Sequence, residues 1–278
     1  MTNVIAENDR AGAAAGPASE SMEFPGGSIQ LFRHGEGRPL LFLHAAGGAG
    51  VWHEFLERLS AGFDVVAPAH PGFGPSDELP EVEDMTDLVY HYIDVIDRLG
   101  LERPDIVGAS FGGWIAAELA VAAPDRVGSL TLLGPVGLRL PDHPVADLFL
   151  MAPEQLGPAL FADPDRAAAM FPAGDPDVED ILAAYRDQTA LARFGWTPFL
   201  SNPKLERRLR RILAPTQVVW AADDAIVPMA HGHRYADSIP GARLTVVEDC
   251  GHAMYLERPA EFASIVGDFV ASTPHRAE

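Results

Sequence analysis

Ser110 has both the residue type and the setting needed for nucleophilic catalysis. It lies in the pentapeptide Gly108-Ala109-Ser110-Phe111-Gly112, which fits the pattern Gly-x-Ser-x-Gly. The pattern follows an apolar run and precedes a helix-forming run, so it predicts a strand, a very tight turn and a helix. Such a turn exposes the serine oxygen, which is a poor nucleophile unless a base and oxyanion donors lie beside it. The two glycines omit side chains that would collide where strand and helix crowd together.

Two further side chains complete a candidate catalytic set. A serine nucleophile requires a base, and the base requires a carboxylate that orients it. Among the ten histidines His252 is the best placed, because it follows a predicted strand and a glycine. Asp223 and Asp224 both follow the predicted strand at residues 216–220, so both qualify as the acid. The chain order serine, acid, histidine is that of the α/β-hydrolases and differs from the two other triad orders.

The serine also needs donors for the negative charge that develops on an attacked carbonyl oxygen. The backbone amide of Phe111 begins the predicted helix that follows Ser110. Amides at a helix N-terminus point at such a charge, and the helix dipole favours it. We therefore expect Phe111 to supply one oxyanion-hole amide.

The elements that must position these residues alternate along the chain. The run 39–43 is continuously apolar, as in a strand buried on both faces, and a hairpin around 25–27 opens the fold. Strands that alternate with helices predict a mostly parallel sheet covered on both faces, with functional groups on loops beyond the carboxyl ends of the strands. The sequence thus predicts an α/β fold with eight strands, at residues 23–24, 28–33, 39–43, 63–68, 105–109, 129–133, 216–220 and 243–247.

A proline-rich stretch at residues 137–204 interrupts this alternation. Short helical segments fit between its prolines, a longer one spans about 178–193, and no strand pattern is strong. Its apolar residues are too many for a solvated linker, so we expect a helical cap inserted over the sheet. The predicted organisation is a core domain at 21–136 and 205–273, the cap at 137–204, a disordered tail at 1–20 and a short tail at 274–278.

Composition argues against several kinds of partner and compartment. A formal charge of −20 disfavours nucleic acid and anionic membranes, because the phosphates would meet no basic patch. The absence of an apolar run of about 18 residues predicts no membrane span, and residues 1–20 lack the pattern of a secretory signal. Cys250 is a lone cysteine, which excludes an internal disulfide and fits a reducing, cytoplasmic compartment. We expect its thiol to pack in the interior.

We expect neither a metal nor a cofactor, and a small-molecule substrate as the partner. His231 and His233 lie on a predicted helix without a nearby third ligand, so surface histidines are the simpler interpretation. The sequence leaves the oligomeric state open.

The motifs together resemble those of lid-bearing serine hydrolases with the α/β-hydrolase fold, a group that includes esterases, C–C bond hydrolases and cofactor-free perhydrolases. The match covers nearly all of residues 23–272. It consists of Leu43-His44, residues 71–76, the serine pentapeptide with Gly113, residues 224–228, and residues 250–252 through Glu257-Arg258-Pro259.

This resemblance implies roles for several residues. It favours Asp224 over Asp223, since the family's acid usually stands four residues before the proline that follows. It implies a second oxyanion amide from the loop after His44, at Ala46. The family usually has glycine directly after that histidine, whereas this chain has Ala45. His44 itself is expected to be structural, hydrogen-bonded within its loop.

The function expected first is hydrolysis of a small, largely apolar carboxylic ester through an acyl-serine intermediate. Serine at position 110 separates the chain from related epoxide hydrolases and haloalkane dehalogenases, which use aspartate there. The alternatives are C–C hydrolysis of a vinylogous diketone, perhydrolysis, or a ligand receptor that retains the triad. Related C–C hydrolases often carry tryptophan after the catalytic histidine, where this chain has Ala253. Trp196 and Phe199 are expected either to line the substrate pocket or to fill the core of the cap.

Overall fold

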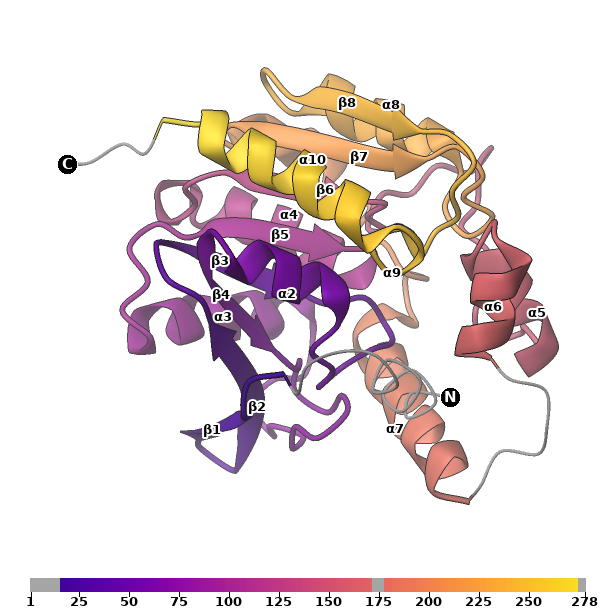
Figure 1. Cartoon of the computed structure of the whole chain (residues 1–278), viewed down its shortest axis with the longest axis horizontal. Coiled ribbons are helices and arrows are strands. Elements are labelled where there is room, and N and C mark those ends of the chain that lie inside the picture. Colours follow the sequence, from indigo (N-terminus) through magenta and orange to yellow (C-terminus); the bar gives the residue numbers. More distant parts are fainter. Residues whose placement is uncertain (1–15, 172–177, 275–278) are drawn as a thin grey trace.

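The computed structural model describes residues 16–171 and 178–274 and contains an eight-stranded sheet (Figure 1). Its strand order is β1-β2-β4-β3-β5-β6-β7-β8, in which β2 pairs antiparallel with β1 and β4 and all other neighbours are parallel. The predicted mostly parallel, eight-stranded α/β fold is therefore confirmed. The strands are β1 Glu20–Phe24, β2 Gly27–His34, β3 Arg38–Leu43, β4 Phe63–Pro68, β5 Asp105–Ala109, β6 Leu130–Leu133, β7 Thr216–Ala221 and β8 Arg243–Val247.

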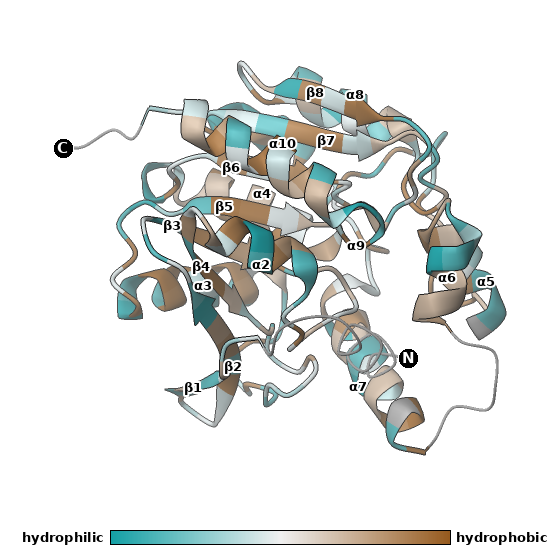
Figure 2. Cartoon of the chain, viewed as in Figure 1, coloured by the Kyte–Doolittle hydropathy of each residue, from teal (hydrophilic) through white to brown (hydrophobic). Residues whose placement is uncertain are grey.

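Helices cover both faces of the sheet because the central strands are apolar on both faces. Successive side chains of a strand point to opposite sides. Leu41 and Leu43 accordingly join the apolar cluster that includes α3 and α4, whereas Leu40 and Phe42 join the cluster that includes α2 and α10. Figure 2 shows hydrophobic residues concentrated on strands such as β4 and β5 between the helices. The covering helices are α2 Glu54–Ser60, α3 Met85–Arg98, α4 Phe111–Ala122, α8 Met229–Ser238, α9 Met254–Glu257 and α10 Pro259–Ser272.

The described part of the insertion has no helix over residues 137–152 and is mainly helical after them. It contains α5 Pro153–Leu160, α6 Pro164–Met170 and α7 Val178–Gly195, the last slightly longer than predicted. A single bridge between Gly137 and Ser201 joins the points where the chain leaves the sheet and returns to it. In Figure 1 the strands β5 and β7 point toward the side on which α5, α6 and α7 lie. The insertion therefore lies at the carboxyl ends of the parallel strands.

Some predicted features fall at or beyond the edges of the described residues. Residues 1–15 and 275–278 contain most of the two predicted tails and lie outside the description, while β1 begins at Glu20, inside the predicted tail. The short elements that the sequence pattern did not predict include α9 and the 3₁₀-helices η2 Pro124–Arg126 and η3 Glu206–Arg211. Within the described ranges, no helix has both the length and the apolar character needed to cross a membrane.

Candidate active site

Ser110 lies at the tight turn between β5 and α4. Its backbone has φ 50° and ψ −109°, a sparsely populated conformation for a residue with a side chain. Strain of this kind costs about 1–3 kcal/mol and persists only where the surrounding structure imposes it. The close packing at Gly112 is part of that constraint, because a Cβ there would lie 2.1 Å from the carbonyl oxygen of Leu43. The turn thus holds the start of α4 directly against the end of β3.

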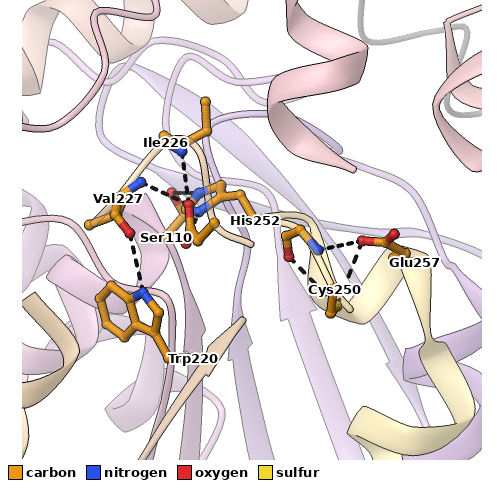
Figure 3. A network of polar contacts seen from close by, with 9 residues as sticks. Ser110, Trp220, Ile226, Val227, Cys250, His252 and Glu257 are labelled. Atoms are coloured by element: carbon orange, nitrogen blue, oxygen red, sulfur yellow. Dashed lines mark hydrogen bonds and ion pairs between the residues drawn. The ribbon is translucent and has the colours of Figure 1, made fainter. Parts of the chain in front are cut away.

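The side chains of Ser110, His252 and Asp224 form one continuous hydrogen-bonded row. Figure 3 shows Ser110 and His252 next to each other at one end of this row. Ser110 Oγ lies 2.9 Å from His252 Nε2, and His252 Nδ1 lies 2.7 Å from Asp224 Oδ2. The imidazole donates from Nδ1 to the carboxylate, which leaves Nε2 free to accept the serine proton. The histidine and aspartate side chains are only 5% and 1% exposed, so this row is largely shielded from water.

The neighbouring loop distinguishes between the two candidate acids. Asp224 Oδ1 accepts hydrogen bonds from the amides of Ile226 and Val227, at 2.9 and 2.8 Å. These bonds hold the carboxylate so that its other oxygen faces His252. Asp223 is exposed, and its backbone amide donates to the Cys250 carbonyl. The structure therefore places Asp224, rather than Asp223, beside the imidazole.

The two predicted oxyanion amides come from segments that touch each other. Phe111 is the first residue of α4, where backbone amides have no carbonyl partner within the helix. A Cβ on Gly112 would lie 2.4 Å from the His44 carbonyl oxygen, so the loop that carries Ala46 runs beside the start of α4. The arrangement is compatible with one amide from each segment. That Phe111 and Ala46 bind an oxyanion stays a prediction.

His44 is held by a network of neutral side chains below this loop. Its Nδ1 donates to the Ala45 carbonyl at 2.5 Å, and its Nε2 accepts from the His70 amide at 2.9 Å. His70 in turn contacts the His44 carbonyl through Nε2 and the Tyr92 hydroxyl through Nδ1. Burial lowers the pKa of His44 to about 4, so the ring is neutral at pH 7. The predicted structural role of His44 within its loop is confirmed.

Burial also lowers the pKa of His53, His70, His91 and His231. The values are about 3 for His53 and about 4 for His91. His53 is 4% exposed among aromatic rings, and its Nδ1 has no hydrogen-bond partner within the described part of the chain. These rings must stay uncharged for the fold to keep its packing.

We expect the free energy of unfolding to fall steeply as the pH drops from about 6.5 to about 4. The unfolded chain binds protons at these histidines near pH 6.5, whereas the folded chain does not until about pH 4 or below. Each such histidine removes about 1.4 kcal/mol per pH unit in this window. Urea unfolding at several pH values gives the slope of the free energy of unfolding against pH. For His53→Leu this slope should be smaller than for the wild type by the contribution of one proton, about 1.4 kcal/mol per pH unit. Exposed His233 offers the control His233→Gln, and equal slopes for all three proteins would contradict the prediction.

The predicted substrate-contacting residues of the insertion lie against Phe149 rather than against the triad. The Trp196 ring is 5.2 Å and the Phe199 ring 6.1 Å from that of Phe149, and Trp196 is 63% exposed. These ring contacts within the described part of the chain lie inside the insertion, so the contact of Trp196 and Phe199 with substrate stays a prediction. Phe194 of α7 approaches the turn more closely, with its ring 6.1 Å from that of Phe111.

Two histidines were predicted to lie on the surface, and this is wrong for His231. It is 1% exposed, because it shares the buried face of α8 with Tyr235, four residues on, and its Nε2 contacts the His143 carbonyl. His233 is exposed as predicted. No cluster that could hold a metal ion occurs among the residues that the structure describes.

Gly134, which was not predicted as part of the site, lies beside the triad. It follows β6, and a Cβ there would lie 3.4 Å from Asp224 Oδ2 and 3.6 Å from His252 Cε1. The available signal was a glycine directly after a predicted buried strand, at the edge of the sheet where the site was expected.

Comparison with known proteins agrees with this geometry. A model of the alpha/beta hydrolase family matches residues 40–265. The 2-hydroxymuconate semialdehyde hydrolase of Pseudomonas sp. (strain CF600) is 33% identical over 87% of this chain and 89% of its own length. The 2-hydroxy-6-oxo-6-phenylhexa-2,4-dienoate hydrolase of Comamonas testosteroni is 31% identical over 85% of this chain and 88% of its own.

A solved structure gives the same result for the fold. The meta-cleavage product hydrolase from Pseudomonas fluorescens IP01 superposes with a TM-score of 0.73 at 23% sequence identity, over 92% of this chain and 98% of that one. The family match, the relatives and the serine–histidine–aspartate row point to the same class of enzyme. This chain belongs to the alpha/beta hydrolase family.

Proposed function

We propose that this serine hydrolase cleaves the carbon–carbon bond beside the 6-oxo carbonyl of a small 2-hydroxy-6-oxo-dienoate. The observation that carries the serine chemistry is the 2.9 Å contact between Ser110 Oγ and His252 Nε2, with Asp224 behind the imidazole. The relatives support the substrate class, since they are named as hydrolases of 2-hydroxymuconate semialdehyde and of a 2-hydroxy-6-oxo-phenylhexadienoate. This substrate displaces the simple ester that the sequence favoured first.

The residues of the site supply each step of such a reaction. His252 takes the proton of Ser110, whose oxygen attacks the 6-oxo carbonyl carbon while the amides of Phe111 and Ala46 stabilise the oxyanion. The bond breaks from the diketone tautomer of the substrate, in which the 2-hydroxyl proton has moved to C5. The electron pair of the C5–C6 bond then passes through the C3–C4 double bond to the C2 carbonyl oxygen, and the imidazolium returns a proton to the dienolate that leaves. Water, deprotonated by His252, then hydrolyses the acyl-serine. Asp224 keeps the imidazole oriented and stabilises its charged form in both halves.

A small carboxylic ester is the second candidate, and Ala253 favours it. This residue follows His252 where related C–C hydrolases often carry tryptophan, so this chain lacks the large ring of those enzymes at that position. The apolar side chains near the turn, including Phe194 and Phe111, also suit an uncharged acyl group. The same serine mechanism applies, with an alcohol as the leaving group.

Parallel assays with both substrates distinguish the candidates. The purified enzyme is incubated with 2-hydroxy-6-oxo-6-phenylhexa-2,4-dienoate and with p-nitrophenyl acetate and butyrate, each against a Ser110→Ala blank. The proposal expects loss of the dienoate colour with a kcat/KM at least about tenfold above that for either ester. A reversed ratio assigns the ester, and turnover equal to the blank for all substrates overturns the serine mechanism.

A further inference from the structure

Glu257 has a buried carboxylate that the catalytic steps do not use. It lies at the end of α9, five residues after His252, and is only 6% exposed. Its Oε2 accepts a hydrogen bond from the Gly251 amide at 2.7 Å and lies 3.6 Å from Cys250 Sγ (Figure 3). Its Oε1 accepts from the Asp163 amide at 2.6 Å. One carboxylate thus connects the loop that carries His252 to the α5–α6 corner of the insertion.

The same corner is fixed to the histidine loop by a second set of contacts. The Ala253 amide donates to the Leu160 carbonyl at 2.8 Å. A Cβ on Gly251 would lie 2.6 Å from that same carbonyl oxygen, so the corner passes directly over the loop. Phe161, Ala167 and Met170 form a small apolar cluster there, with Ala253 and Leu256 packed against it.

These contacts fix the backbone on both sides of the catalytic histidine. The amide before His252 is bound to Glu257, and the amide after it is bound to Leu160. Hydrogen bonds from amides to a carboxylate are charge-assisted and about twice as strong as neutral ones. Burial, with the Glu257 charge as a smaller contribution, raises the pKa of the Cys250 thiol to about 12, so the thiol stays protonated and remains a donor.

We propose that Glu257 is a positioning residue, which holds the His252 loop and the α5–α6 corner in one fixed arrangement so that the imidazole meets Ser110. This inference rests on the proposed serine mechanism. It predicts that an isosteric change at Glu257 lowers the rate of serine attack without a matching change in substrate binding. The effect must be indirect, because the hydrogen bonds of Glu257 go to Asp163, Cys250 and Gly251 rather than to Ser110 or the imidazole.

The test is Glu257→Gln, read by the rate at which a fluorophosphonate labels Ser110. Glutamine has one acceptor oxygen, so its amide nitrogen must face either the Gly251 or the Asp163 amide as a second donor. We expect labelling and kcat to fall about 10- to 100-fold, as for a small displacement of a reacting group, with KM within about twofold. Glu261→Gln is the matched control, since Glu261 is an exposed glutamate nearby that pairs with Arg258, and it should label at the wild-type rate.

A second readout separates positioning from simple loss of stability. The proton between His252 Nδ1 and Asp224 gives a low-field ¹H resonance, which should shift or broaden in folded Glu257→Gln and persist in Glu261→Gln. If Glu257→Gln does not fold by circular dichroism, Glu257→Asp carries the same prediction, because a side chain one methylene shorter cannot span both amides.

The outcomes keep this inference separate from the proposed function. Wild-type labelling rate, kcat and resonance in the folded variant overturn the role of Glu257. Failure of the wild type itself to label at Ser110 instead overturns the serine mechanism, and the resonance, which requires no turnover, then decides whether Glu257 positions the imidazole.

Discussion

Replacing Ser110 with alanine is expected to lower kcat by about a million-fold, the loss typical of removing the nucleophile from a serine–histidine–aspartate set. The substitution removes one oxygen, whose described contact is the 2.9 Å hydrogen bond with His252 Nε2. Asp224 keeps its contact with His252 Nδ1 and its two amide donors, so the remaining groups of the site stay in place. The loss therefore reports the chemical step rather than a rearranged site.

Stability should change little in the same variant. Alanine has the same Cβ as serine, so the backbone strain at φ 50° is carried equally by both proteins. The measurements are single-turnover kinetics with the dienoate and the esters, labelling by a fluorophosphonate, and thermal unfolding. Labelling of Ser110→Ala at the wild-type rate would show that another residue is the nucleophile, whatever substrate the enzyme prefers.

The sheet was predictable because its central strands are buried on both faces and therefore read as apolar runs. Residues 39–43 illustrate this, because their side chains alternate between two apolar clusters, one on each face of the sheet, and none needs to be polar. Short elements carry no such pattern. The four-residue α9 is too short to show a helical period, and η3 contains four arginines and one leucine, so no apolar stripe marks it.

The parts of the site that depend on local geometry were also predictable. The turn at Ser110 needs glycine at position 112 for steric reasons, and that requirement is visible in the sequence. The sequence indicated Glu257 only as part of a family motif, and its contacts could not be predicted. Its partners Asp163 and Gly251 lie 94 and 6 residues away and bind it through backbone amides, which leave no pattern in the sequence. The position of Trp196 could not be predicted either, because its 63% exposure depends on how the insertion packs.

The second large expected effect is the loss of kcat when Asp224, rather than Asp223, is replaced. Asp224→Asn should lower kcat by about ten-thousand-fold, because the imidazole is then held in the wrong tautomer. The asparagine oxygen remains the acceptor for the Ile226 and Val227 amides, so its NH₂ group faces His252 Nδ1 and donates to it. The imidazole proton then lies on Nε2, which can no longer accept the proton of Ser110.

Asp223→Asn is the matched control, with the same loss of charge one residue away. Its side chain is exposed, and the described contact of this residue is made by its backbone amide, which the substitution leaves unchanged. We expect its kcat within about twofold of wild type, as for a surface substitution away from the reacting groups. Fluorophosphonate labelling rates of the two variants across the pH range where both are folded make the comparison independent of substrate. A loss in Asp223→Asn as large as that in Asp224→Asn would contradict the assignment, because the imidazole nitrogen Nδ1 is hydrogen-bonded to the Asp224 carboxylate and the exposed Asp223 side chain should be dispensable.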